Sequence, residues 1–106
     1  METTTIKEGT KFTIMYLCNG ATQTKRIVTS AEIEIVHANK ATWKALDIKE
    51  KVKFEKNNKC RLEFGEVYSE SALGLAVMGK TANEVCFMEL PAHQGGIHQL
   101  IILDIL

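Results

Sequence analysis

Apolar and polar residues alternate with a period of two along much of the chain, a pattern typical of β-strands that have one buried face. Asn19-Gly20 follows the first alternating stretch and predicts a hairpin with a type I′ turn, because both central residues of that turn need a positive φ. Gln94-Gly95-Gly96 predicts another turn near the end of the chain. The pattern as a whole predicts strands over 11–18, 24–29, 31–36, 84–90 and 97–105.

The middle of the chain, residues 30–66, shows the same period. Glu32-Ile33-Glu34-Ile35 predicts a strand with one solvated face. Residues 51–64 alternate on both sides of Asn57-Asn58, which predicts a second hairpin. We interpret its charged faces as solvated surface rather than as a binding patch. Residues 39–48 fit either a short helix or an irregular connection.

One short helix is predicted at about 69–79. Ser69 and Ser71 can cap its first turn, since a serine oxygen accepts a hydrogen bond from an unpaired N–H there. Gly79 fits the left-handed position at its end. The apolar residues of this segment recur at helical spacing, at Leu73, Ala76 and Val77. One helix among several strands predicts an α+β domain with a mainly antiparallel sheet.

The composition is that of a single globular domain spanning residues 1–106, with 45% hydrophobic residues. Its 13 basic and 13 acidic residues balance, which argues against a sequence-blind nucleic-acid binder that relies on surplus positive charge. No apolar run approaches the length of a membrane helix. Composition therefore predicts a soluble protein that does not bind membranes. We also expect no direct sequence-specific binding of nucleic acid.

The start of the chain and the cysteines suggest a cytoplasmic protein. The first six residues lack the basic and apolar regions of a signal peptide, and Met1 with a threonine-rich start is typical of a natural N-terminus. The three cysteines are odd in number and far apart, so we expect free thiols in a reducing compartment. They are Cys18, Cys60 and Cys86.

Residues that could carry chemistry are few. His93 and His98 have no companion cysteines nearby and a poor spacing for zinc, so we expect no metal site. The segment Gly74–Thr81 matches the phosphate-loop pattern letter for letter. A phosphate loop needs a buried strand before it and a helix starting at its Lys-Thr pair, and this segment has neither. We therefore interpret the match as a helix with a glycine end, and expect no cofactor.

The last third of the chain resembles a known family. Residues 67–80 read VYSESALGLAVMGK, and they are followed by Asn83-Glu84-Val85, by Glu89-Leu90-Pro91 and by an apolar final strand. This order is similar to the C-terminal domain of the Gre transcript-cleavage factors and their Rnk-type relatives. Residues 9–28 resemble the opening of that domain more loosely. Ala72 replaces the usual proline, and residues 30–66 are a divergent middle segment that looks like an inserted hairpin.

The resemblance implies an FKBP-like fold, in which a twisted antiparallel sheet packs on one short helix. In Gre factors this domain docks on the rim of the RNA polymerase secondary channel, against a coiled coil of the largest subunits. A separate N-terminal coiled coil with an acidic tip carries the catalytic magnesium. The period-two pattern of the first 66 residues lacks the heptads of such a coiled coil. The resemblance thus implies a polymerase-binding, non-enzymatic protein without cleavage activity, and a shared fold does not imply prolyl isomerase activity.

Carried over to this sequence, the docking loop lies at the entrance to the helix and offers hydroxyls, backbone groups and an exposed apolar residue to a partner. It consists of Ser69, Glu70, Ser71, Ala72 and Leu73. Two other functions stay open. The aliphatic end Leu100–Leu106 would make the domain a self-assembly module, as a homodimer, if it covers a subunit interface. A small enzyme or ligand binder would use Gly74–Thr81 or the histidine pair.

Overall fold

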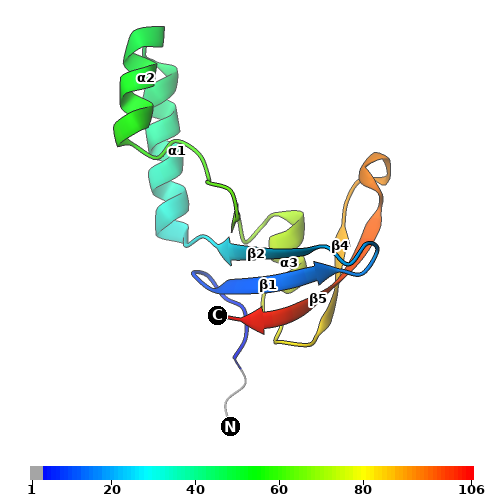
Figure 1. Ribbon diagram of the computed structural model, residues 1–106. Coiled ribbons are helices and arrows are strands. Elements are labelled where there is room, and N and C mark those ends of the chain that lie inside the picture. Colours follow the sequence, from blue (N-terminus) through cyan, green and yellow to red (C-terminus); the bar gives the residue numbers. More distant parts are fainter. Residues whose placement is uncertain (1–3) are drawn as a thin grey trace. The chain divides into compact units, whose positions relative to one another are not determined.

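The computed structural model describes residues 4–106, so Met1 and Thr3 of the threonine-rich start lie outside the described residues. The chain divides into two compact units, which can be followed in Figure 1 by its colours along the sequence. The sheet unit is Met1–Val28 with Gly65–Leu106, and the helical unit is Thr29–Phe64. The strands are β1 Lys11–Tyr16, β2 Thr22–Ile27, β3 Glu66–Val67, β4 Val85–Glu89 and β5 Ile97–Ile105. The helices are α1 Ser30–Lys44, α2 Ile48–Asn57, α3 Ala72–Val77 and the 3-10 turn Ala92–Gln94.

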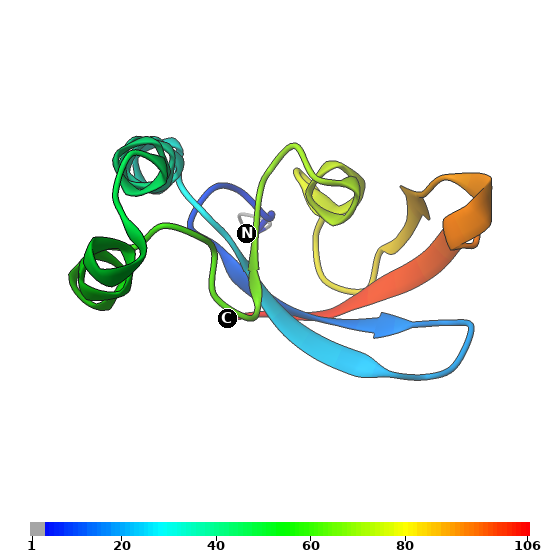
Figure 2. The ribbon, with the colours of Figure 1, turned by 90° about the horizontal axis from the view of Figure 1, so that it is seen from above.

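The five strands of the sheet unit form one sheet in the order β3-β2-β1-β5-β4. All neighbours are antiparallel except β2 and β3, which are parallel. Parallel neighbours need a long connection between them, and the helical unit supplies it in the sequence. The sheet is curled, and Figure 2 shows α3 on its concave side. The predicted α+β class and the FKBP-like arrangement of a twisted sheet on a short helix are confirmed.

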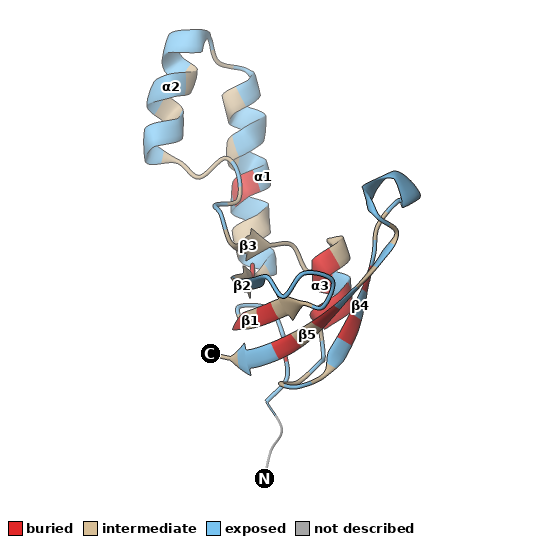
Figure 3. Ribbon diagram, turned by 45° about the vertical axis from the view of Figure 1, so that its right-hand side comes forward, coloured by how far each residue is buried: buried red, intermediate tan, exposed pale blue. Residues whose placement is uncertain are grey.

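The core of the sheet unit lies between the sheet and α3. Phe12 and Ile14 of β1 and Leu100 and Ile102 of β5 are fully buried, and Figure 3 shows this burial along β1, β5, β4 and α3. Ile6 also joins the core, at 1% exposure. Residues 4–10 are therefore anchored by a buried side chain. Burying each such side chain stabilises the fold by about 1.5–3 kcal/mol.

The first hairpin forms where it was predicted, but its turn is of another kind. Tyr16 N–H donates to the carbonyl of Ala21 at 2.8 Å, so four residues form the loop. Gly20 has a φ of 71°, and Asn19 does not share its left-handed conformation. Asn19 instead accepts a hydrogen bond from Ala21 N–H at its Oδ1, at 2.9 Å. The type I′ prediction was wrong because this side-chain bond holds the turn without a second positive φ.

The middle of the chain is helical, and the predictions of a strand at 31–36 and of a hairpin of strands at 51–64 were wrong. Residues 30–44 form α1 and residues 48–57 form α2. These helices run antiparallel as a helical hairpin, side by side in Figure 1. The ambiguous segment 39–48 is the end of α1 and the tip of this hairpin. The expected insertion is thus a hairpin of helices, not of strands.

The start of each helix carries a signal that the alternation concealed. Thr29 accepts a hydrogen bond from Glu32 N–H at 3.2 Å, and Asp47 accepts one from Glu50 N–H at 2.8 Å. Threonine or aspartate followed three residues later by glutamate is the capping-box spacing. In addition, no glycine or proline occurs between Gly20 and Gly65, so nothing breaks a helix there. These caps outweighed a period of two that extends over only a few residues.

Candidate functional site

The helix-entrance loop, Ser69–Leu73, is shaped by Ser71. Its Oγ accepts a hydrogen bond from Gly74 N–H at 3.1 Å and donates one to the carbonyl of Tyr68 at 2.7 Å. Its own N–H also donates to that carbonyl, at 3.1 Å. Ser71 is therefore the N-cap of α3 and at the same time closes the preceding turn. The predicted capping role is confirmed for Ser71.

Gly74 allows the loop to fold back on the helix. A Cβ at this position would lie 2.2 Å from the carbonyl oxygen of Tyr68 and 2.6 Å from that of Ser69. No side chain fits at such distances, so only glycine permits this close approach. The loop geometry thus depends on two neighbouring positions, the Ser71 cap and the bare Gly74 backbone.

The five residues predicted as a docking surface differ in exposure. Glu70 is exposed, and Ser69 and Ser71 are half-buried. Ala72 packs against the core and Leu73 belongs to it, at 9% exposure. The expectation that Leu73 offers an apolar contact to a partner does not fit this burial. Its side chain turns inward because α3 has a single face on the sheet.

Leu75 is the residue that the sequence prediction missed. It lies on α3 two positions after Leu73, and 70% of it is exposed. Residues two positions apart on a helix are separated by about 200° of rotation, so one of the pair faces inward and the other outward. Helical periodicity around Leu73, Ala76 and Val77 could have identified Leu75 as the outward leucine. Glu70 and Leu75 therefore form the accessible part of the helix entrance.

The phosphate-loop match of residues 74–81 is a helix and its end, as we interpreted it. Gly74 and Val77 lie within α3, and Gly79 has a φ of 77°. Lys80 and Thr81 follow the C-terminus of this helix, whereas a phosphate would need the N-terminus of one. Lys80 N–H donates to the carbonyl of Val77 at 3.0 Å, and this bond continues the end of the helix.

The histidines and cysteines are dispersed. Within residues 4–106, no three His, Cys, Asp or Glu side chains come close enough to hold a metal ion. His98 Nε2 lies 3.4 Å from the carbonyl oxygen of Gln94. Cys18 is exposed and Cys60 is half-buried, while Cys86 lies in the core. Burial raises the pKa of the Cys86 thiol above its ordinary value, so this cysteine is a weak nucleophile.

The face of the sheet opposite the core carries an apolar row. Ile101 of β5 is paired with Met15 of β1 on one side and with Val85 of β4 on the other. Alternation places these residues opposite the buried Ile102. The apolar surface continues on Phe87, which is 58% exposed. β5 thus has a neighbouring strand on each side, and its outer face remains accessible.

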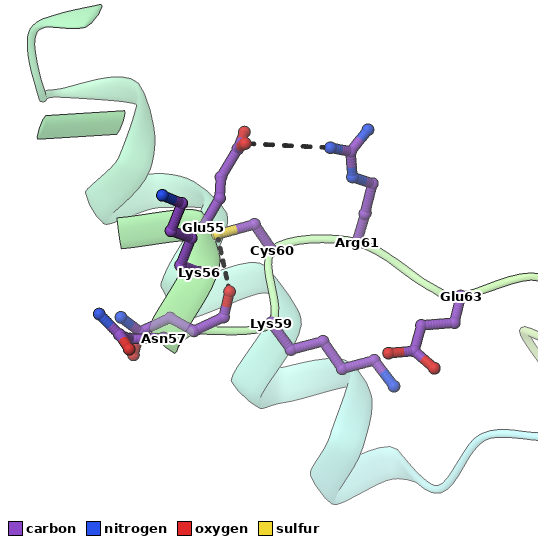
Figure 4. Close-up of a pocket in the computed structure, with 8 residues that line it drawn as sticks. Glu55, Lys56, Asn57, Lys59, Cys60, Arg61 and Glu63 are labelled. Atoms are coloured by element: carbon purple, nitrogen blue, oxygen red, sulfur yellow. Dashed lines mark hydrogen bonds and ion pairs between the residues drawn. The ribbon is translucent and has the colours of Figure 1, made fainter. Parts of the chain in front are cut away.

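A hollow of about 370 Å³ lies in the helical unit at the end of α2, and Figure 4 shows its lining. Glu55 and Arg61 face each other there at 4.0 Å, and the side chain of Lys59 extends toward Glu63. Cys60 Sγ lies 3.6 Å from the carbonyl oxygen of Asn58. The hollow has mixed charges on an open surface, which is typical of a solvated helix end rather than of a small-molecule site.

Among residues 4–106, no helix is both long and apolar enough to cross a membrane. The sequence matches no protein-family model and no curated protein significantly. The structure is similar to that of the transcription factor Gfh1, with a TM-score of 0.58 and 13% identity over 98% of this chain and 49% of that one. It is also similar to GreA factor homolog 1 (Gfh1) of Thermus thermophilus, with a TM-score of 0.56 and 13% identity over 99% of this chain and 50% of that one. This chain spans about half the length of both, and the likeness shows that it has a Gre-like fold.

Proposed function

We propose that this protein is a single Gre C-terminal-like domain with an inserted helical hairpin, and that it binds RNA polymerase in the cytoplasm without cleaving transcripts. The observation that carries the proposal is the helix entrance, where the Ser71 cap and the bare Gly74 backbone build the loop that the family resemblance points to. The shared fold with the transcription factor Gfh1 supports it. The expected contact is the coiled coil of the largest subunits at the secondary channel.

The contact residues of the proposed docking loop follow from exposure. Glu70 and Leu75 can reach a partner, while Ser71 and Gly74 hold the loop in shape. A small interface combines an apolar anchor with a polar rim, and Leu75 and Glu70 supply one residue of each kind. Ser69 and Ala72 are half-buried and contribute at the edge of this surface.

The absence of cleavage activity is the second part of the proposal. The hairpin tip, residues 45–47, contains one carboxylate, that of Asp47. That carboxylate accepts a hydrogen bond from Glu50 N–H and thereby caps α2. A carboxylate that accepts this capping hydrogen bond is less available to bind magnesium, as the acidic tip does in Gre factors.

The test is retention of bacterial RNA polymerase on the immobilised protein. We expect the wild type to retain polymerase. The affinity of a Glu70→Lys, Leu75→Asp variant for polymerase should be at least about tenfold lower, as for the loss of a central interface residue. The matched control is Glu89→Lys, Ile97→Asp, which makes the same changes at exposed positions of β4 and β5. Circular dichroism verifies that both variants are folded. Failure of the wild type to retain polymerase, or equal losses in both variants, contradicts the docking proposal.

Cleavage is tested separately on backtracked polymerase complexes. We expect no shortening of the transcript when this protein is added, and shortening when a Gre factor is added as the positive control. Shortening by this protein alone contradicts the second part of the proposal.

A second function, self-assembly, is favoured by the apolar row of Met15, Ile101 and Val85 on the outer sheet face. Burying such a row between two copies would remove apolar surface from water. Analytical ultracentrifugation tests it: a homodimer that becomes a monomer with Phe87→Asp supports this function. A monomer at all concentrations excludes it.

A further inference from the structure

The charges of this chain are unevenly distributed, although they sum to zero. Residues 40–61 hold eight Lys and Arg against three Asp and Glu, a net charge of +5. The remaining 84 residues hold five against ten, a net charge of −5. The basic stretch comprises the end of α1, the tip of the hairpin and α2. The total charge of zero averages over these two parts and conceals the basic one.

Three lysines of α2 form a straight row. Lys49, Lys53 and Lys56 follow one another at spacings of four and three residues, within an arc of about 60° on the helix. They are exposed, and their ammonium groups form no hydrogen bond or ion pair with any residue from 4 to 106. At 1.5 Å of rise per residue, their spacings are about 6 Å and 4.5 Å along the axis.

The row points away from α1. The opposite side of α2 contains Lys51 and Phe54, which are less exposed than the row. The ammonium group of Lys51 lies over the ring of Trp43 in α1, at 4.5 Å from its centroid. This contact identifies the side of α2 that meets α1, and it leaves the lysine row on the free side of the hairpin.

The row is unfavourable for the helix itself. Like charges at spacings of three and four residues repel each other and destabilise a helix. At these spacings Lys53 has two like-charged neighbours, Lys49 and Lys56, and one acidic neighbour, Glu50, so repulsion outnumbers attraction. A partner with regularly spaced negative charges would remove this repulsion.

We infer that the lysine row of α2 binds the phosphate backbone of double-stranded DNA, without regard to sequence. Lysines are depleted at the centres of protein interfaces, where aromatic residues and arginine predominate, so the row fits a polyanion better than a protein surface. Single-stranded nucleic acid is bound through exposed aromatic rings, and α2 has none on this face. The wide major groove of B-form DNA admits a helix, whereas the narrow major groove of duplex RNA does not. This inference goes beyond the proposed function and does not depend on it.

The test is fluorescence anisotropy with a labelled random-sequence DNA duplex over a range of salt. Each lysine that neutralises a phosphate contributes about −0.9 to the slope of log K against log salt, so we expect about −2.7 for three lysines. The affinity should fall about 40-fold between roughly 50 and 200 mM salt. A Lys49→Gln, Lys53→Gln, Lys56→Gln variant should lose at least about tenfold in affinity and most of this slope.

The matched control is Lys7→Gln, Lys11→Gln, Lys80→Gln, which gives the same net charge from exposed lysines of the sheet unit. It should retain the affinity and slope of the wild type. Lys53→Glu is the folding control for α2, because it turns two repulsions at these spacings into attractions and only one attraction into a repulsion. Its melting temperature should equal or exceed that of the wild type while DNA binding falls.

Four results would overturn the inference. The wild type does not bind the duplex at low salt, or the control triple variant loses as much affinity as the α2 variant. Single-stranded DNA or duplex RNA of the same sequence binds at least as tightly as the DNA duplex. Polyglutamate, or vesicles of anionic lipid, bind the protein with the same affinity as DNA and the same dependence on the lysine row. The row would then be a site for any polyanion.

Discussion

Nη2 of Arg26 lies 2.6 Å from Oε2 of Glu66, and this ion pair joins the strand before the helical unit to the strand after it. The Glu66 side chain is 11% exposed and that of Arg26 is 31% exposed. Backbone bonds reinforce the same junction, because Arg26 N–H donates to the carbonyl of Gly65 at 2.8 Å. The long connection between two parallel strands is thus closed at its base by a half-buried charge pair.

Breaking this pair should destabilise the sheet unit. Hydrogen bonds to charged groups contribute about 1.5–3 kcal/mol, and partial exposure screens part of that. We therefore expect a coupling free energy of about 1–2 kcal/mol from a double-mutant cycle of Arg26→Met and Glu66→Gln, measured by urea unfolding. The control is the exposed pair Glu55 and Arg61 at 4.0 Å, whose coupling should be below about 0.5 kcal/mol. Equal coupling free energies for the two pairs would show that the Arg26–Glu66 pair does not stabilise this junction.

Replacing Gly74 with alanine should destabilise the fold, although alanine is the better helix former. A Cβ there would meet the carbonyls of Tyr68 and Ser69, so the loop or the helix must shift. We expect a loss of about 1–3 kcal/mol by urea unfolding, as for other overpacked positions. Gly79→Ala is the comparison, because nothing lies within 4 Å of a Cβ at that position. Its cost, about 1–2 kcal/mol, should come from the positive φ alone. A stabilising Gly74→Ala would show that the loop does not press on α3.

Removing the cap of α3 should cost about 1 kcal/mol of unfolding free energy. Ser71→Ala removes both the acceptor for Gly74 N–H and the donor to the Tyr68 carbonyl. Ser71→Thr keeps a hydroxyl at the same place and should retain most of the stability. Thermal unfolding of the three proteins compares them, and a threonine variant as unstable as the alanine variant would argue that the hydroxyl is unimportant.

The buried thiol of Cys86 should make the fold less stable in alkali. Desolvation raises the folded pKa of Cys86. Lys80 lowers this pKa to a smaller extent, and Glu84 raises it slightly further. A folded pKa above the unfolded one means that the folded state holds the proton longer. The stabilisation is therefore complete below the ordinary thiol pKa of 9.0 and is lost as the pH rises through the folded pKa.

Unfolding in urea between neutral and alkaline pH measures this dependence. The wild type should lose more stability above the ordinary thiol pKa than Cys86→Ala, which has no thiol to titrate there. In native protein, a thiol reagent should modify the exposed Cys18 well before Cys86. Identical pH profiles for wild type and Cys86→Ala would show that the thiol does not contribute.

Much of the sheet unit could be predicted from local patterns, because each of its signals depends on neighbours in the sequence. The serine cap at Ser71 and the left-handed Gly79 mark the ends of α3, and both were predicted. The final strand was predicted with its observed bounds, because it is an aliphatic run that follows the Gln94-Gly95-Gly96 turn. The family resemblance added how these elements assemble, which periodicity alone does not indicate.

The helical unit was mispredicted because a short alternation does not distinguish strand from helix. Ile33 and Ile35 suggested one face of a strand, yet Ile35 is 57% exposed on α1 and Val36 is the buried residue of that helix. The capping residues Thr29 and Asp47 would have indicated helices, since a cap commits the backbone of its first turn whatever the period beyond it.

The sequence by itself determined the class of the fold, the ends of α3, the bounds of β5 and the cap on which the proposed docking loop depends. Only the tertiary structure decided that Gly74 lies against the backbone of Tyr68 and that Lys49, Lys53 and Lys56 share the exposed side of α2. The reason is that exposure and charge clustering depend on which residues become neighbours in space. A helix brings together positions three and four apart, whereas a strand places positions two and four apart on one face and positions three apart on opposite faces.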